Sequence, residues 1–254
     1  MLGAKGRFPM DKMELIIIRH GDPDYEHDSL TAQGRVEAEL MAKRLSQMEI
    51  TAFYVSPLGR AQATADYTLK AMGRSAETRE WMREFHAPIT DIHTGETRIP
   101  WDWLPADWTT IPAFYDKDKW YQEKVMADAN VIDEARRVYE GLDELIATHG
   151  YRREGNYYRA VRPNMDTIVL FCHFGVECVM LGHLLGMSPM VLWHGCAAAP
   201  TSMTVLTTEE RREGIAYFRM NTFGDTGHLY IAGEKPSFSA RFCEMFSNTD
   251  ERHD

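Results

Sequence analysis

The chain has 254 residues, a length that suits one α/β domain, and its 44% hydrophobic and 11% aromatic residues exclude a disordered protein. The net charge of −10 repels polyanions, so we expect no nucleic-acid partner. No apolar run approaches the roughly 20 residues that cross a bilayer, and the start lacks the apolar segment of a signal peptide. We therefore predict a cytoplasmic protein with no membrane partner, whose four cysteines are reduced thiols.

The first third of the chain alternates between strand and helix patterns. Residues 14–19 (ELIIIR) form a short β-branched run, which is typical of a buried parallel strand. From Thr31 the pattern becomes helical, with Val36 on the apolar face and Glu37 largely on another. Residues 51–55 then predict a second strand.

A helix start is expected at Ser56 and Pro57, because serine caps helices well and proline suits the first helical position. Gly73 should end this helix. Residues 85–127 interrupt the alternation with four tryptophans and four prolines. Since both flanks continue the α/β pattern, we predict an inserted cap subdomain there rather than a separate domain.

The alternation resumes with an amphipathic helix from Val131 to a stop near Gly150, followed by a polar link. Residues 166–172 are the clearest buried strand of the chain, and a helix should follow it as far as Gly186. Two more strand-like runs occupy residues 202–207 and 215–220.

This order of elements predicts a three-layer α/β/α sandwich with a mostly parallel sheet and a capping insertion. We expect residues 1–254 to form a single domain with a core at about 14–233 and loose N- and C-terminal tails. The oligomeric state is left open.

Two histidines occupy equivalent places, because His20 and His173 each follow a buried strand directly. Ligands of open α/β sheets bind beyond the carboxyl ends of the strands, so Arg19 and Arg60 should converge there with both histidines. A neutral imidazole is a good nucleophile toward phosphorus, and arginine forks match the oxygens of a phosphoryl group. A second histidine can contact the same oxygens, and a carboxyl group can protonate the leaving oxygen.

Five segments in order resemble the histidine phosphatase, or phosphoglycerate-mutase-like, superfamily. Together they span about residues 14–229 and leave the tryptophan-rich insert unmatched. The segments are residues 15–21 (LIIIRHG), 30–35 (LTAQGR), 56–65 (SPLGRAQATA), 169–175 (VLFCHFG) and 225–229 (DTGHL).

The resemblance implies a role for each matching residue and a small phosphorylated metabolite as the partner, with no metal or other cofactor. The proton donor of the family is an acidic residue soon after the Arg60 helix, where Glu84 is our assignment and Glu80 its rival. Two departures concern residues 22–23, which replace the usual glutamate and serine or threonine, and Phe174, which replaces a glycine. The implied set is His20 as the phosphorylated nucleophile, Arg19, Arg60 and His173 in the phosphate pocket, and Glu84 as the acid.

We therefore predict a metal-independent phosphatase that hydrolyses a small phosphomonoester through a phosphohistidine on His20. The alternatives are a phosphoglycerate-type mutase and a non-catalytic module that binds a phosphate ligand or a protein. A cysteine-phosphatase interpretation of Cys172 fails because position 178 holds a cysteine instead of the required arginine. No ligand spacing supports a metal site at His183 or His194, and we expect a structural hydrogen bond from His228.

Overall fold

The computed structural model describes residues 12–92, 94–237 and 245–249 of the chain. Of the predicted loose tails, residues 1–11, 238–244 and 250–254 lie outside this description.

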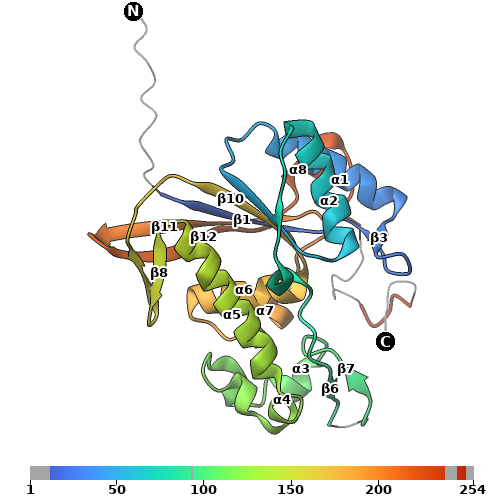
Figure 1. Cartoon of the computed structure of the whole chain (residues 1–254). Helices are drawn as coiled ribbons and strands as arrows, with labels where there is room; N and C mark the ends of the chain where they lie inside the picture. Colours follow the sequence, from blue (N-terminus) through green and yellow to red (C-terminus); the bar gives the residue numbers. More distant parts are fainter. Residues whose placement is uncertain (1–11, 93, 238–244, 250–254) are drawn as a thin grey trace, which may run out of the picture.

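An eight-stranded sheet with the order β5-β4-β10-β1-β11-β12-β9-β8 forms the centre of the molecule (Figure 1). Strands β5, β4, β10 and β1 pair in parallel, while the other half of the sheet pairs antiparallel. The strands are β1 (Glu14–Arg19), β4 (Ala52–Val55), β5 (Glu77–Thr78), β8 (Tyr151–Glu154), β9 (Tyr157–Ala160), β10 (Thr167–Cys172), β11 (Met203–Arg212) and β12 (Ile215–Asp225). Two small hairpins, β2 (Pro23–Asp24) with β3 (Ser29–Leu30) and β6 (Ile89–Thr90) with β7 (Thr97–Arg98), stand apart from it.

Helices cover both faces of the sheet, so the predicted three-layer α/β/α sandwich is confirmed (Figure 1). One layer holds α1 (Ala32–Leu45), α2 (Gly59–Met72) and α8 (Gly227–Ala232). The other holds α5 (Val131–Thr148), α6 (Phe174–Leu185) and α7 (Pro189–Gly195). None of the helices in the described ranges is long and apolar enough to cross a membrane.

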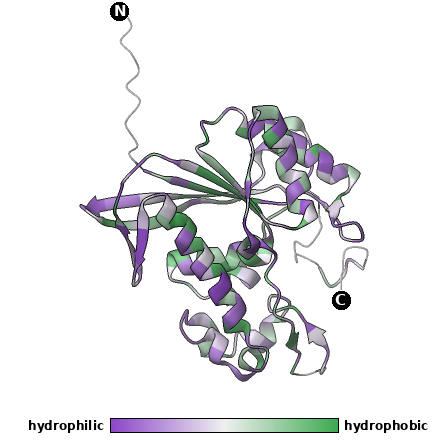
Figure 2. Cartoon of the chain, in the orientation of Figure 1, coloured by the Kyte–Doolittle hydropathy of each residue, from purple (hydrophilic) through white to green (hydrophobic). Residues whose placement is uncertain are grey.

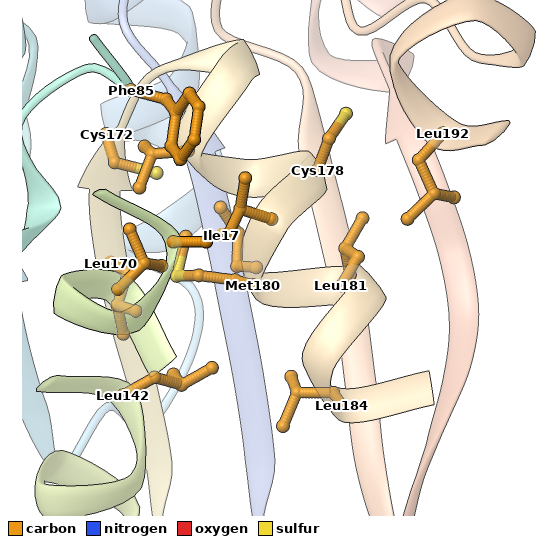
Figure 3. Packing of buried hydrophobic residues seen from close by; sticks show 14 of the residues in the cluster. Ile17, Phe85, Leu142, Leu170, Cys172, Cys178, Met180, Leu181, Leu184 and Leu192 are labelled. Atoms are coloured by element: carbon orange, nitrogen blue, oxygen red, sulfur yellow. The ribbon is translucent and has the colours of Figure 1, made fainter. Parts of the chain in front are cut away.

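Each central strand divides its side chains between two hydrophobic cores, because successive residues of a strand point to opposite faces. Leu15 and Ile17 pack with the α5 and α6 side, whereas Ile16 and Ile18 pack with the α1 and α2 side. Figure 2 shows the resulting band of apolar strands between the two helical layers. In Figure 3, Met180 of α6 lies against Ile17 and the neighbouring strand β10.

The predicted insert, residues 85–127, contains short elements around buried aromatic rings. They include β6 and β7, α3 (Pro105–Trp108), α4 (Lys124–Asp128) and three-residue or four-residue 3₁₀ turns. Trp101, Trp108 and Trp120 are each at most 8% exposed. These rings belong to the same hydrophobic cluster as α5 and α6, so the insert packs onto that layer of the sandwich.

The predicted start of α2 at Ser56 and Pro57 is wrong, because the helix begins at Gly59 after an extended Leu58. The cap comes from another segment, where the Asp28 carboxylate accepts the Gly59 N–H at 2.6 Å. Ser56 instead bonds a histidine, as described below.

The prediction for α1 is wrong at Val36 and Glu37. Val36 is 40% exposed, while Glu37 is fully buried. Burial of this carboxylate is compensated by the backbone N–H groups of Asp22 and Ser237, at 2.9 and 3.1 Å.

The polar link expected at residues 151–165 contains the β8–β9 hairpin, whose turn places Gly155 at φ 61°. This hairpin extends the sheet beyond β12, through pairing of Ile215 and Ala216 with β9. The last two predicted strands exist and run further than expected, to Arg212 and Asp225.

Candidate active site

The structure brings the predicted histidines and arginines together at the carboxyl ends of the parallel strands. Arg19 ends β1, His20 follows it, His173 follows β10, and Arg60 lies in the first turn of α2 after β4. The imidazole centroids of His20 and His173 are 5.1 Å apart. Arg19 and His20 are 2% exposed and His173 is fully buried, so charges here interact through little solvent.

The His20 ring has a fixed tautomer. Its Nδ1 lies 2.7 Å from the Gly21 carbonyl oxygen, which can only accept, so Nδ1 carries the proton. Burial lowers the pKa of His20 well below its usual range, and the charges of Arg19 and Arg60 lower it further. The neutral ring therefore carries its lone pair on Nε2.

The His173 ring is held by Ser56, whose Oγ lies 2.7 Å from Nε2. Ser56 Oγ also accepts the Leu58 N–H, so its own proton is free to be donated to His173 Nε2. In that arrangement Nδ1 carries the histidine proton, and within the described residues Nδ1 is buried without a hydrogen-bond partner. Burial lowers the pKa of His173 strongly, followed by the effects of His20 and Arg60. His173 can thus act as a neutral donor.

Arg60 is oriented by Asp28, which lies on the loop between β2 and β3. The Arg60 Nη1 donates to Asp28 Oδ1 at 2.7 Å, and the same carboxylate caps α2 at Gly59. The approach is so close that a Cβ at Gly59 would collide with the Asp28 carbonyl oxygen. The guanidinium lowers the pKa values of His20 and His173, which places its positive charge in the same site.

Arg19 is held from the other side of the site, where its Nη1 donates to the Ala198 carbonyl oxygen. Burial lowers the pKa of the Arg19 guanidinium, and the carboxylates of Glu84 and Glu177 act in the opposite direction. Guanidinium groups are not deprotonated in proteins, so Arg19 stays positively charged. Two fixed positive groups therefore flank the histidines.

Glu84 lies at the N-terminus of α6, beside His173. Its carboxylate accepts the N–H groups of Phe85 at 2.8 Å, Val176 at 2.9 Å and Gly175 at 3.3 Å. Burial raises the pKa of Glu84 above its ordinary value, against the lowering effect of these hydrogen bonds. The rival Glu80 is exposed on the short 3₁₀ turn before it.

Gly175 is a point of close approach between Glu84 and the insert. A Cβ there would lie 2.8 Å from Glu84 Oε1 and 2.8 Å from the ring of Trp101. The Gly175 carbonyl oxygen accepts the indole N–H of Trp193 at 3.0 Å. Aromatic rings therefore border the carboxyl group and contribute to its desolvation.

The other residues that the sequence analysis weighed are buried or hydrogen-bonded to neighbouring groups, as expected of residues that support the fold. Cys172 is fully buried and burial raises its pKa strongly, which suits a packed thiol and no nucleophile. His183 bonds Asp143 at 2.9 Å, and His194 Nδ1 donates to the Met190 carbonyl oxygen at 2.8 Å. His228 hydrogen-bonds Thr201, as expected of a structural histidine.

The departure at residues 22–23 ties the loop after His20 to α1. Asp22 Oδ2 accepts the Thr31 hydroxyl at 2.7 Å, and Thr31 Oγ1 in turn accepts the Gly34 N–H and caps the helix. Phe174, the second departure, is 4% exposed and starts α6 inside the core.

Sequence reasoning missed the part that three residues play beside the site. Asp28 bonds Arg60, Ser56 bonds His173, and Glu177 is 1% exposed on α6. Each depends on contacts between distant segments. Only Glu177 gave a signal, as a lone acid in an otherwise apolar helix.

The sequence profile of the histidine phosphatase superfamily (branch 1) matches residues 15–221. The probable phosphoglycerate mutase GpmB of Serratia proteamaculans is 31% identical over 97 residues, which cover 35% of this chain. The match spans 45% of the length of that curated relative.

Solved structures of this superfamily share the fold. A mycobacterial glucosyl-3-phosphoglycerate phosphatase has a TM-score of 0.57 and 20% identity, over 85% of this chain and 100% of that protein. A phosphoserine phosphatase of Entamoeba histolytica, in complex with phosphoserine, has a TM-score of 0.54 and 21% identity, over 85% and 99%. The profile covers most of the sequence and includes the first four of the five segments. This chain therefore belongs to the histidine phosphatase superfamily.

Proposed function

We propose that this chain is a metal-independent phosphatase that hydrolyses a small phosphomonoester through a phosphohistidine on His20. The observation that carries the proposal is the hydrogen bond from His20 Nδ1 to the Gly21 carbonyl oxygen, which leaves the lone pair on Nε2. Burial lowers the pKa of this ring and so favours its neutral form, and the charges of Arg19 and Arg60 add to the effect. A neutral, oriented imidazole between two guanidinium groups is suited to attack a phosphoryl group.

In the first step, His20 Nε2 attacks the phosphorus atom, the N–P bond forms and the ester P–O bond breaks. Glu84 gives its proton to the leaving oxygen, and its raised pKa keeps it protonated to a higher pH than an ordinary glutamate. Arg19, Arg60 and His173 Nδ1 contact the phosphoryl oxygens and stabilise the charge that develops on them.

In the second step, water attacks the phosphorus atom of the phosphohistidine. The Glu84 carboxylate takes a proton from this water, the N–P bond breaks, and its electron pair returns to Nε2. Inorganic phosphate is released, and His20 and Glu84 regain their starting protonation states.

Hydrolysis is favoured over the mutase alternative by the charge of the insert. Residues 85–127 contain four lysines and arginines against seven aspartates and glutamates. Arg98, one of the four basic residues, contacts the acidic Asp91 at 3.3 Å. A mutase must hold a doubly phosphorylated intermediate, and an acidic insert beside the site repels it. The glucosyl-3-phosphoglycerate and phosphoserine phosphatases of the same fold support this choice.

The nucleophile is tested by trapping the intermediate. Wild-type protein mixed with a phosphomonoester should carry an acid-labile, alkali-stable phosphate on His20, and His20→Asn should lose both label and turnover while melting at the wild-type temperature. Free phosphate as the product, without isomerised phosphoglycerate, separates hydrolysis from mutase activity. Full turnover by His20→Asn would refute the mechanism, and a folded wild type with no activity across phosphorylated metabolites would favour a non-catalytic binding module.

The acid is tested by the choice of leaving group. Glu84→Gln should slow hydrolysis of alkyl phosphates ~10²–10⁴-fold, because their alkoxides need a proton. p-Nitrophenyl phosphate should be affected far less, since nitrophenolate leaves without one. Glu80→Gln is the matched control and should behave as wild type on both substrates. If Glu80→Gln shows the selective loss instead, the acid is Glu80 and the assignment to Glu84 is wrong.

A further inference from the structure

The segment from Ala198 to Ser202 runs across the end of β1 and contacts both residues there. The Arg19 backbone N–H donates to the Ser202 carbonyl oxygen at 3.2 Å, and the Arg19 guanidinium donates to the Ala198 carbonyl oxygen. The Thr201 N–H donates to the His20 carbonyl oxygen at 3.1 Å. One five-residue segment thus holds both Arg19 and His20.

The contact from Thr201 fixes the peptide unit that joins His20 to Gly21. The carbonyl oxygen of this unit accepts the Thr201 N–H, and its N–H donates to Thr64 Oγ1 at 2.9 Å. Both polar groups of the unit are therefore held, which fixes its plane. The next carbonyl, that of Gly21, is the acceptor that sets the His20 ring.

Thr201 makes this contact from a strained conformation. Its φ is 55°, in the left-handed region that a β-branched residue rarely adopts, and its side chain is fully buried. Such a conformation persists only where its surroundings enforce it. Here Thr201 Oγ1 lies 3.0 Å from Nε2 of His228, which is 5% exposed on α8.

The turn that carries His228 is anchored to α1. Asp225, just before α8, forms a 2.5 Å ion pair with Arg44 of α1 and accepts the Gly227 N–H at 2.8 Å. Burial lowers the pKa of His228 to about 4, and Arg44 contributes, so the ring is neutral at neutral pH. The hydrogen bond to Thr201 is therefore between two neutral groups.

We infer that Thr201 and His228 are positioning residues for catalysis: His228 holds Thr201 in its left-handed conformation, and Thr201 holds the His20–Gly21 peptide so that Nε2 faces the phosphorus atom. The inference rests on the proposed role of His20 as the nucleophile. Neither residue needs to touch the substrate. Misplacement of a reacting group by about 1 Å can cost on the order of 10²-fold in rate, so the effect should lie in the phosphorylation step.

The test compares two substitutions at one site. Thr201→Val keeps the branched shape and loses only the hydroxyl, whereas Thr201→Ser keeps the hydroxyl. We expect Thr201→Val to lower kcat roughly 10-fold to 10²-fold, with KM and inhibition by inorganic phosphate changed less than about twofold. Thr201→Ser should recover most of the loss. Equal kcat in both variants, or a loss confined to KM, would overturn the inference.

A double-mutant cycle tests the link to His228. His228→Phe, which keeps an aromatic ring but cannot hydrogen-bond, should lower kcat to a similar extent, and Thr201→Val combined with it should add little, because both changes break the same hydrogen bond. Thr226→Val, on the same turn and without a side-chain capping bond, is the control and should match wild type. If the fold-losses in kcat of the two single variants multiply in the double variant, the two residues act separately.

The inference and the proposed function fail in different ways. Rapid-quench measurement of the phosphohistidine reports the first step directly in the intact chain. Slower labelling of His20 in Thr201→Val, at an unchanged final level, supports positioning. Labelling at the wild-type rate refutes the positioning role alone, whereas the absence of label in wild-type protein refutes the proposed function.

Discussion

Glu177 offers a direct test of the electrostatics around the site. It lies on α6, one turn beyond His173, and is 1% exposed. Burial raises its pKa from 4.5 to about 7, although the charge of Arg19 acts in the opposite direction. The folded protein therefore favours the neutral carboxyl group more than the unfolded chain does, and Glu177→Gln replaces that group with a neutral side chain of similar shape.

The magnitude follows from linkage between protonation and folding. A rise from 4.5 to about 7 corresponds to about 3 kcal/mol of preference for the neutral form. The wild type keeps its full stability below the unfolded pKa and loses this amount as the pH rises through about 7. The glutamine side chain does not ionise. The free energy of unfolding of the variant should therefore exceed that of the wild type by an amount that grows as the pH rises from 4.5 to about 7.

Urea denaturation at several pH values measures this difference. We expect Glu177→Gln to exceed wild type by under about 1 kcal/mol near pH 5 and by about 3 kcal/mol near pH 8. Glu144→Gln, an exposed position on α5, should stay within about 0.5 kcal/mol of wild type throughout. A difference for Glu177→Gln that does not change with pH would refute the reasoning.

Three further predictions concern the geometry of the site. Asp28→Asn should raise KM several-fold with a smaller effect on kcat, because Arg60 loses its charged partner; an unchanged KM would contradict this orienting role. Gly175→Ala should lower kcat roughly 10-fold to 10²-fold, since its Cβ would displace Glu84 or Trp101, and steady-state kinetics with a melting curve separates this from unfolding. Activity should survive exhaustive EDTA treatment, because two arginines repel cations from the site; a loss that one specific metal restores would show the opposite.

The parts of the fold with local patterns could be predicted from the sequence. The run over residues 14–19 is β1 as predicted, and the strand before His173 is β10. Gly73 and Gly186 both adopt the left-handed conformation that ends a helix. These signals depend only on neighbouring residues.

The errors come from contacts between distant segments. Ser56 has the local features of a cap, yet Asp28 supplies the cap of α2 and leaves Ser56 to bond His173. Glu37 was predicted to lie away from the apolar face of its helix, but it is buried, and backbone N–H groups from distant segments compensate its burial. The positions of Arg19, His20 and His173 followed from the strand ends, whereas the partners that orient them lie elsewhere in the chain and had no local signal.

The shared core of the insert and the sandwich has a consequence for the evolution of specificity. Trp101 borders the Glu84 carboxyl group and also belongs to the apolar cluster that holds α5 and α6. A substitution that changes the size of this ring would alter the surroundings of Glu84 and would also remove packing from the main fold. Changes at the buried rings of the insert should therefore require stabilising mutations beforehand, whereas exposed insert residues such as Leu104 can change without loss of core packing.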